Sequence, residues 1–113
     1  MPRDYKLYLE DILVAIERIN SYTQSIDFNT FQGDTQKVDA VLYNLEVIGE
    51  AAKNVPMDLR SAYSGIEWRK IVGLRDIIVH EYFGVSLEIV WDIIQNKLPG
   101  LHKLIKKMLE DAS

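Results

Sequence analysis

Residues 68–82, WRKIVGLRDIIVHEY, predict a helix with one buried face. Apolar side chains recur there at the i, i+3, i+4, i+7 spacing of such a face: Trp68, Ile71, Val72, Ile78, Val79 and Tyr82. Arg75 occupies the middle of this face, where Leu would be expected. A buried guanidinium without a partner is strongly unfavourable. We therefore expect Arg75 to meet an anion, to face a water-filled cleft, or to lie at a subunit interface.

The same helical spacing extends on both sides of this stretch. It predicts four main helices, which cover 4–23, 35–54, 67–82 and a stretch that begins at 86, and a short helical turn at 56–63. The fourth helix is expected to be interrupted at Pro99-Gly100 and to continue into a tail at 101–109. No run with a period of two is long enough for a strand. The sequence therefore predicts an all-α, antiparallel up-and-down bundle of four to five helices.

Individual residues indicate where helices begin and end, and one glycine indicates where two helices could pack closely. Asp34 and Ser86 are expected N-caps, and Gly84 is expected as a C-terminal cap. The segment 25–33 is expected to break the helical chain. Gly49 lies on the apolar stripe of the second main helix and is small enough for a partner helix to approach closely.

Composition limits the classes of protein that remain. At 113 residues we expect one domain, 1–113. The net charge of −4 argues against a general nucleic-acid coat protein. No apolar run approaches the roughly 20 residues that span a bilayer, and residues 1–5 lack the apolar region of a signal peptide. We expect a soluble cytoplasmic protein.

The polar residues of the 68–82 helix have a defined angular relation. Asp76 and His80 are four apart, so a carboxylate–imidazole hydrogen bond is plausible. Arg75 and Tyr82 are seven apart and share a face, whereas Arg75 and His80 lie about 140° apart around the axis. Either the helix frays before His80, or long side chains curl around it, or a second copy supplies the missing group. The last option predicts a dimer with a composite cleft.

Each of these residues has a functional and a structural reading. His80 suits proton transfer because imidazole titrates near neutrality, but it could simply bond Asp76 at the helix end. Arg75 suits a phosphate clamp, but it could instead form a salt bridge to Glu46 or Glu50. Tyr82 could be plain packing. Two histidines without cysteine argue against a zinc site, and we expect no metal and no cofactor.

Three stretches together carry a family resemblance. Arg75-x4-His80-x-Tyr82 resembles the Arg-x4-His-x-Tyr motif of HepT proteins in the HEPN superfamily. Residues 44–53, NLEVIGEAAK, resemble the second-helix signature of that family, and residues 68–76 resemble the entry to its motif helix. One departure is Ile66-Glu67 before Trp68, where many relatives have Pro; it should change only the helix start.

The resemblance implies a fold, an activity and a partner. It implies a helical bundle that dimerises and places paired Arg and His groups at a shared cleft. Such proteins are toxins of toxin–antitoxin modules and metal-independent ribonucleases, partnered with a minimal nucleotidyltransferase that adenylylates the motif tyrosine. Here that implies catalytic Arg75 and His80, modification of Tyr82, RNA as substrate, and supporting roles for Asp76, Glu46 and Glu50.

Two rival classes remain at this point. The chain could be a non-catalytic subunit that binds a nucleotide for a nucleotidyltransferase, and it would then bind nucleotides without turning over RNA. It could also be a purely structural dimeric scaffold, with Arg75 in a salt bridge and no solvent path to His80.

Overall fold

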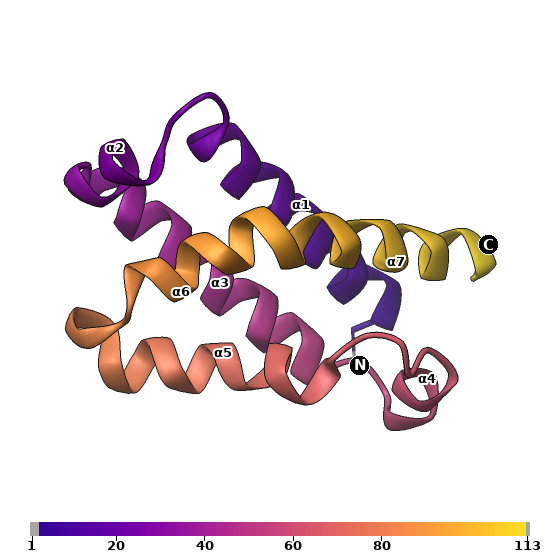
Figure 1. Ribbon diagram of the computed structural model, residues 1–113. Coiled ribbons are helices and arrows are strands. Elements are labelled where there is room, and N and C mark those ends of the chain that lie inside the picture. The colour runs from indigo at the N-terminus through magenta and orange to yellow at the C-terminus, as the bar shows by residue number, and fades with distance from the viewer. Residues whose placement is uncertain (1–2, 113) are drawn as a thin grey trace.

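The computed structural model describes residues 3–112, and over this range the chain is helical without strands (Figure 1). Its elements are α1 (Tyr5–Thr23), α2 (Phe28–Gly33), α3 (Thr35–Lys53), α4 (Met57–Ala62), α5 (Trp68–Glu81), a 3₁₀ turn η1 (Tyr82–Gly84), α6 (Leu87–Asp92), a π-helical turn η2 (Ile93–Lys97) and α7 (Leu98–Asp111). The predicted domain 1–113 also includes Met1, Pro2 and Ser113, and the stretch 1–5 includes the first two. These three residues lie outside the described residues. The all-α prediction is confirmed.

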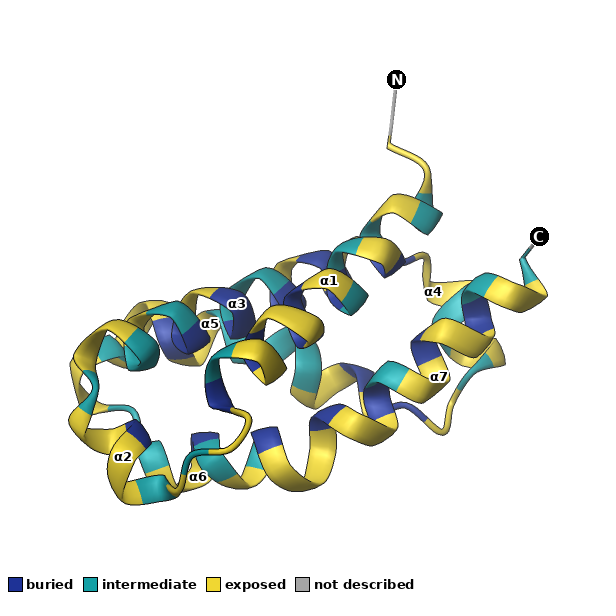
Figure 2. Cartoon of the chain, turned by 90° about the horizontal axis from the view of Figure 1, so that it is seen from above, coloured by how far each residue is buried: buried dark blue, intermediate teal, exposed yellow. Residues whose placement is uncertain are grey.

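Helix α3 is the centre of the architecture. It packs against both α1 and α5, and the chain reverses direction from each of these helices to the next (Figure 1). The continuous segment from α6 through η2 to α7 forms a second layer that contacts α1 (Figure 2). The core between the layers is aliphatic and includes Leu9, Ile16, Leu45, Ile48 and Ile105. No helix within residues 3–112 has the length and apolarity needed to cross a membrane.

The expected N-caps are confirmed. The Asp34 side chain accepts from the Lys37 amide at 3.1 Å, and the Ser86 hydroxyl accepts from the Ile89 amide at 3.3 Å. Each cap satisfies one of the amides that a helix start leaves without an intrahelical partner.

The segment 25–33 differs from its prediction as a simple break. After Ser25, whose φ is 66°, the chain forms α2, and Asp27 caps it by accepting from the Thr30 amide at 2.8 Å. Phe31 is fully buried and packs its ring 5.2 Å from that of Trp91. This contact across the layers explains why a single turn of helix persists in a segment with weak helical periodicity.

Two further helix ends differ in detail from the sequence prediction. Gly84 does not adopt the left-handed conformation of a C-terminal cap, because α5 tightens into η1 before it. The expected interruption at Pro99 is the π-helical turn η2, which leads directly into α7. Since Pro has no amide hydrogen to donate to the preceding turn, wider winding before it accommodates the ring without ending the helix.

Helix α5 is less buried than its apolar pattern predicts. Trp68 and Ile78 are buried, but Val79 is 48% exposed. The reason is that, within residues 3–112, α3 is the one helix with which α5 makes extensive contact. This contact depends on Gly49 of α3, where a Cβ atom would lie 2.8 Å from the Arg75 backbone nitrogen and 3.1 Å from the Ile71 carbonyl oxygen. The small residue at 49 therefore sets the distance between the two helices.

Gly49→Ala should destabilise the chain by about 1–3 kcal/mol, because the added methyl group must push the α5 backbone away from α3. The matched control is Gly73→Ala on α5, where nothing lies within 4 Å of the added Cβ. That change should stabilise the chain by up to about 0.5–1 kcal/mol through helix propensity. Urea unfolding of both variants measures the difference, and equal stability of the two variants would contradict the close-packing account.

Candidate functional site

Arg75 extends from α5 toward α3 and meets two carboxylates. Its Nε lies 3.1 Å from Glu50 Oε2, and its Nη1 lies 3.2 Å from Asp76 Oδ1. The Arg75 side chain is 40% exposed, and of the three alternatives expected for it the structure shows the first, contact with an anion. Ion pairs this exposed contribute only about 0–1 kcal/mol. A guanidinium has five N–H donors, so this one can also bind a phosphate.

His80 lies in the exposed last turn of α5. Its Nδ1 is 2.8 Å from the backbone carbonyl oxygen of Asp76 and not bonded to the Asp76 carboxylate, which instead pairs with Arg75. The expected carboxylate–imidazole bond is therefore replaced by a main-chain one. Because a carbonyl can only accept, this bond places a hydrogen on Nδ1. In the neutral ring, Nε2 then carries a free lone pair, as a general base requires.

Tyr82 begins η1 and is tied to α3. Its hydroxyl donates to Asp39 Oδ1 at 2.6 Å. The hydrogen bond to Asp39, with smaller contributions from burial and from the negative charges of Asp39 and Glu46, raises the pKa of Tyr82 to about 12. The phenol is thus held neutral with its hydrogen directed at a carboxylate.

The carboxylates beneath the motif form one row along α3. Asp39, Glu46 and Glu50 are spaced by seven and four residues, so they lie on the same side of the helix. Two partners were expected for Arg75. Glu50 forms the ion pair with it, whereas the negative charge of Glu46 contributes to the raised pKa of Tyr82. Asp39 was not identified from the sequence. Its spacing from Glu46 was the signal that could have found it.

The structure therefore brings some of the predicted residues together and separates others. Arg75 and Tyr82 both reach α3, as their shared face predicts, and Glu50 and Asp76 flank Arg75. His80 belongs to another side of α5. Within residues 3–112, no cluster of three or more His, Asp or Glu side chains could hold a metal ion.

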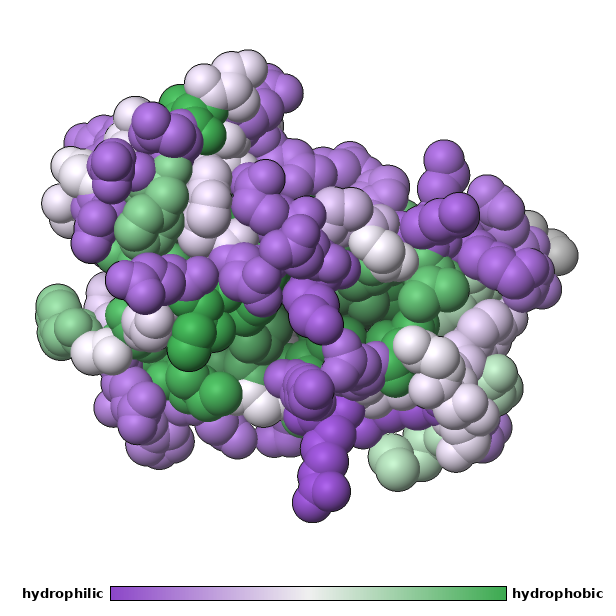
Figure 3. All heavy atoms as spheres, viewed as in Figure 1, coloured by the Kyte–Doolittle hydropathy of each residue, from purple (hydrophilic) through white to green (hydrophobic). Residues whose placement is uncertain are grey.

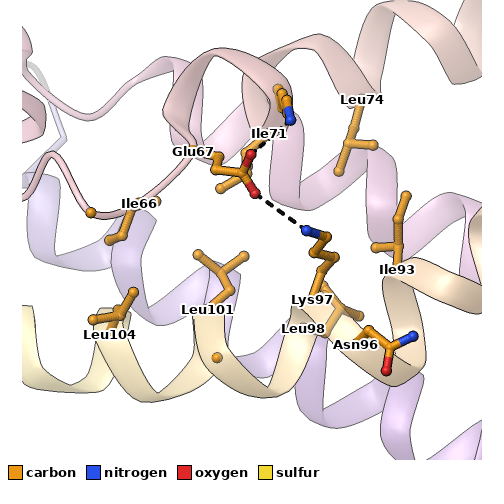
Figure 4. A pocket seen from close by; sticks show the side chains of 13 residues that line it. Ile66, Glu67, Ile71, Leu74, Ile93, Asn96, Lys97, Leu98, Leu101 and Leu104 are labelled. Atoms are coloured by element: carbon orange, nitrogen blue, oxygen red, sulfur yellow. Dashed lines mark ion pairs between the residues drawn. The ribbon is translucent and has the colours of Figure 1, made fainter.

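A groove of about 300 Å³ lies between α5 and α7, apart from the motif. Figure 3 shows apolar side chains in the trough between the two helical layers, with hydrophilic side chains crossing it. In the close view, Ile71 of α5 lies across the groove from Leu101 of α7, and Leu74 lies across from Ile93 (Figure 4). Glu67 pairs with Lys97 at 3.8 Å across the opening (Figure 4). The groove is lined mainly by apolar side chains, together with Glu67, Lys70 and Lys97, and contains none of the motif residues Arg75, His80 and Tyr82.

The phenol of Tyr82 should titrate about two units above an ordinary tyrosine. The difference in absorbance at 295 nm between the wild type and Tyr82→Phe should have its midpoint near pH 12, and Asp39→Asn should move it toward 10. Because the raised pKa favours the neutral phenol in the folded state, its stabilising effect is complete below pH 10 and is lost as pH rises through 12. Circular dichroism at each pH gives the folded range. A midpoint near 10 in the folded wild type would contradict the Asp39 contact.

Comparison with known proteins places this chain in a family. The family model "Ribonuclease HepT-like" matches residues 12–108. The chain is 40% identical to "Probable ribonuclease HepT" of Thermococcus cleftensis, covering 96% of this chain and 98% of that protein. It is also 40% identical to "Putative RNase MJ0127" of Methanocaldococcus jannaschii, covering 98% and 93%.

A third relative is longer than this chain. It is "Gamma-glutamylcyclotransferase and putative RNase MJ0434" of the same archaeon, 39% identical over 98% of this chain, and the chain spans only 50% of its length. No solved structure matches the chain. The family resemblance read from the motif is confirmed: the chain belongs to the HepT-like ribonuclease family.

Proposed function

We propose that the chain is the toxin of a toxin–antitoxin module, an endoribonuclease whose site joins Arg75 of one protomer to His80 of its partner. The observation that carries this proposal is the divergence of the two side chains on α5. Arg75 reaches Glu50 on α3, whereas the ring of His80 is exposed about 140° around the helix. One helix cannot direct both groups at the same phosphodiester, but two facing copies of α5 can.

RNA supplies its own nucleophile for this reaction. A 2′-hydroxyl attacks the adjacent phosphorus, the bond to the 5′-oxygen of the next nucleotide breaks, and a 2′,3′-cyclic phosphate forms. Nε2 of the neutral His80 in that site takes the 2′-hydroxyl proton, and the leaving 5′-oxygen takes a proton from solvent. Because the nucleophile is a hydroxyl held next to the phosphorus, the reaction does not require a metal-activated water.

Arg75 stabilises the charge that develops on phosphorus. Its two ion pairs are exposed and weak, so a phosphate can replace Glu50 or Asp76 at small cost. Asp76 acts twice, since its carboxylate holds Arg75 and its backbone carbonyl fixes the hydrogen on Nδ1 of His80. The acidic row on α3 disfavours RNA that is not held by Arg75, which restricts binding to the cleft.

Exposed apolar side chains next to the motif support a homodimer. Val79 is 48% exposed and lies about 40° around α5 from Arg75, and Phe83 is completely exposed. Tyr43 on α3 is 61% exposed. Val79 and Phe83 are four residues apart where α5 passes into η1, and apolar side chains exposed close together are typical of an interaction surface. Pairing two chains here would bring two motif helices together.

Modification of Tyr82 would explain how such a toxin is neutralised in the cytoplasm. A cognate minimal nucleotidyltransferase would transfer AMP to the phenol, adding a phosphodiester and a nucleoside close to Arg75. The new phosphate would pair with that guanidinium, and the nucleoside would fill the space that RNA needs. The hydroxyl is directed at α3 on the same side as Arg75, which supports this position as the modified one.

Arg75→Ala and His80→Ala should each reduce cleavage of RNA by about 10²–10⁴-fold, because each removes a group that acts on the transition state. His102→Ala on α7, whose ring pairs with Glu17 at 3.0 Å, is the matched control and should retain activity. The measurement is cleavage of total RNA by purified protein. Wild-type protein that binds nucleotides but never cleaves RNA would instead favour the non-catalytic subunit.

Tyr82→Phe should remain an active toxin but accept no AMP from a cognate minimal nucleotidyltransferase, since the attacking oxygen is gone. Tyr43→Phe is the matched control, because Tyr43 is an exposed tyrosine of α3 without the motif contact, and it should be modified as the wild type is. Mass spectrometry of co-expressed protein checks both. AMP found on any residue other than Tyr82 would refute the assignment.

A further inference from the structure

The hydroxyl of Tyr82 is held by a carboxylate that the motif does not include. The distance of 2.6 Å from Oη to Asp39 Oδ1 lies in the short range of charge-assisted O–H···O⁻ bonds. Asp39 comes from the second turn of α3 and Tyr82 from η1, 43 positions later, so the pair forms only in the folded chain. The Asp39 side chain is exposed, so solvent can reach its carboxylate.

We propose that Asp39 is the proton acceptor for Tyr82 when this phenol attacks phosphorus, so that the chain carries the base for its own modification. This inference rests on the proposed adenylylation of Tyr82 and adds a catalytic residue to it. Asp39 then acts on the acceptor side of the transfer, while the partner transferase holds the nucleotide.

The step balances with ATP as the donor. A bond forms between Tyr82 Oη and the α-phosphorus, and the bond from that phosphorus to the bridging oxygen of the β-phosphate breaks. Pyrophosphate leaves with the electron pair. The phenolic proton moves along the existing hydrogen bond to Asp39 Oδ1 and then to solvent. No second proton acceptor is needed, because the contact already has the geometry of the transfer.

Removing the Asp39 carboxylate should change the reactivity of Tyr82 in opposite directions, depending on whether Asp39 only holds the ring or takes the proton. The carboxylate raises the pKa of Tyr82 to about 12, which lowers the fraction of phenolate roughly a hundredfold relative to an ordinary tyrosine. If Asp39 only holds the ring, its removal should make Tyr82 more reactive at neutral pH. If Asp39 takes the proton during attack, its removal should make Tyr82 less reactive. The other charged group of α3 that acts on this phenol is Glu46, which is present in both cases.

A second tyrosine in the chain provides an internal control. Tyr63, just after α4, donates to Asp111 Oδ2 at 2.7 Å, and this bond raises the pKa of Tyr63. The pairing of phenol and carboxylate is the same, but it lies outside the motif. Asp111→Asn should therefore change the behaviour of Tyr63 and leave Tyr82 as it is.

The test measures the reaction of Tyr82 with a small arylsulfonyl fluoride, which forms a bond to the phenolic oxygen without any transferase. Purified wild type, Asp39→Asn, Asp39→Glu and Asp111→Asn are labelled from pH 6 to 9, and mass spectrometry follows each tyrosine separately. In the wild type the labelling rate of Tyr82 should be nearly independent of pH. In Asp39→Asn it should be at least about tenfold slower at pH 7 and rise about tenfold per pH unit, as free phenolate does.

Asp39→Glu keeps a carboxylate and should restore the flat pH profile. Equal pH slopes in the wild type and Asp39→Asn, faster labelling of Asp39→Asn at pH 7, or no labelling of wild-type Tyr82 would each overturn the proposal. Thermal unfolding followed by circular dichroism checks that Asp39→Asn is folded. Co-expression with a cognate minimal nucleotidyltransferase separates the two claims. Wild type without AMP refutes the proposed neutralisation, whereas the labelling profile alone tests the role of Asp39.

Discussion

The close approach of α5 to α3 at Gly49 is the constraint on which the candidate site depends. With a Cβ atom there, the Arg75 backbone nitrogen would be only 2.8 Å away, so a larger residue separates the helices. At the observed separation, Glu50 reaches the Arg75 guanidinium and Asp39 reaches the Tyr82 hydroxyl. One glycine therefore fixes the position of two motif side chains, and it does so through backbone contact and not through side-chain packing.

The site that results is balanced electrostatically and not strongly basic. A chain with a net charge of −4 places a row of carboxylates beside the arginine proposed to hold phosphate. These exposed ion pairs orient Arg75 at little energetic cost, and a phosphodiester can displace them. The same row holds the hydroxyl of Tyr82, so an AMP group on that oxygen would carry its phosphate to the guanidinium. The proposed mechanism and the proposed inhibition thus both depend on the same face of α3.

Much of this arrangement could be predicted from the sequence, and the exceptions have physical causes. Helical spacing and the capping residues Asp34 and Ser86 located the main helices. Helix α2 was missed because its stability comes from the contact of Phe31 with Trp91 across the layers, which no local pattern reveals. The partial burial of α5 depends on how few neighbours pack against it.

Within the site, the sequence predicted how the motif residues are arranged on their helix, but only some of their contacts with the rest of the fold. The spacing of Arg75 and His80 predicted their divergence, and one of two expected carboxylates, Glu50, meets Arg75. The bond of His80 to a backbone carbonyl was not predicted, because Arg75 competes for the Asp76 carboxylate. Asp39 was not identified because its partner lies 43 residues away.

The central claim is that each active site joins two protomers, and a mixed dimer tests it most directly. Arg75→Ala and His80→Ala chains carrying different tags can be co-expressed, and the mixed dimer isolated on both tags in turn. In that dimer, one of the two composite sites has both native groups, so RNA cleavage should recover to about half of the wild-type rate. If Arg75 and His80 of the same chain act together, neither site is intact. A mixed dimer as inactive as its parents would contradict the account.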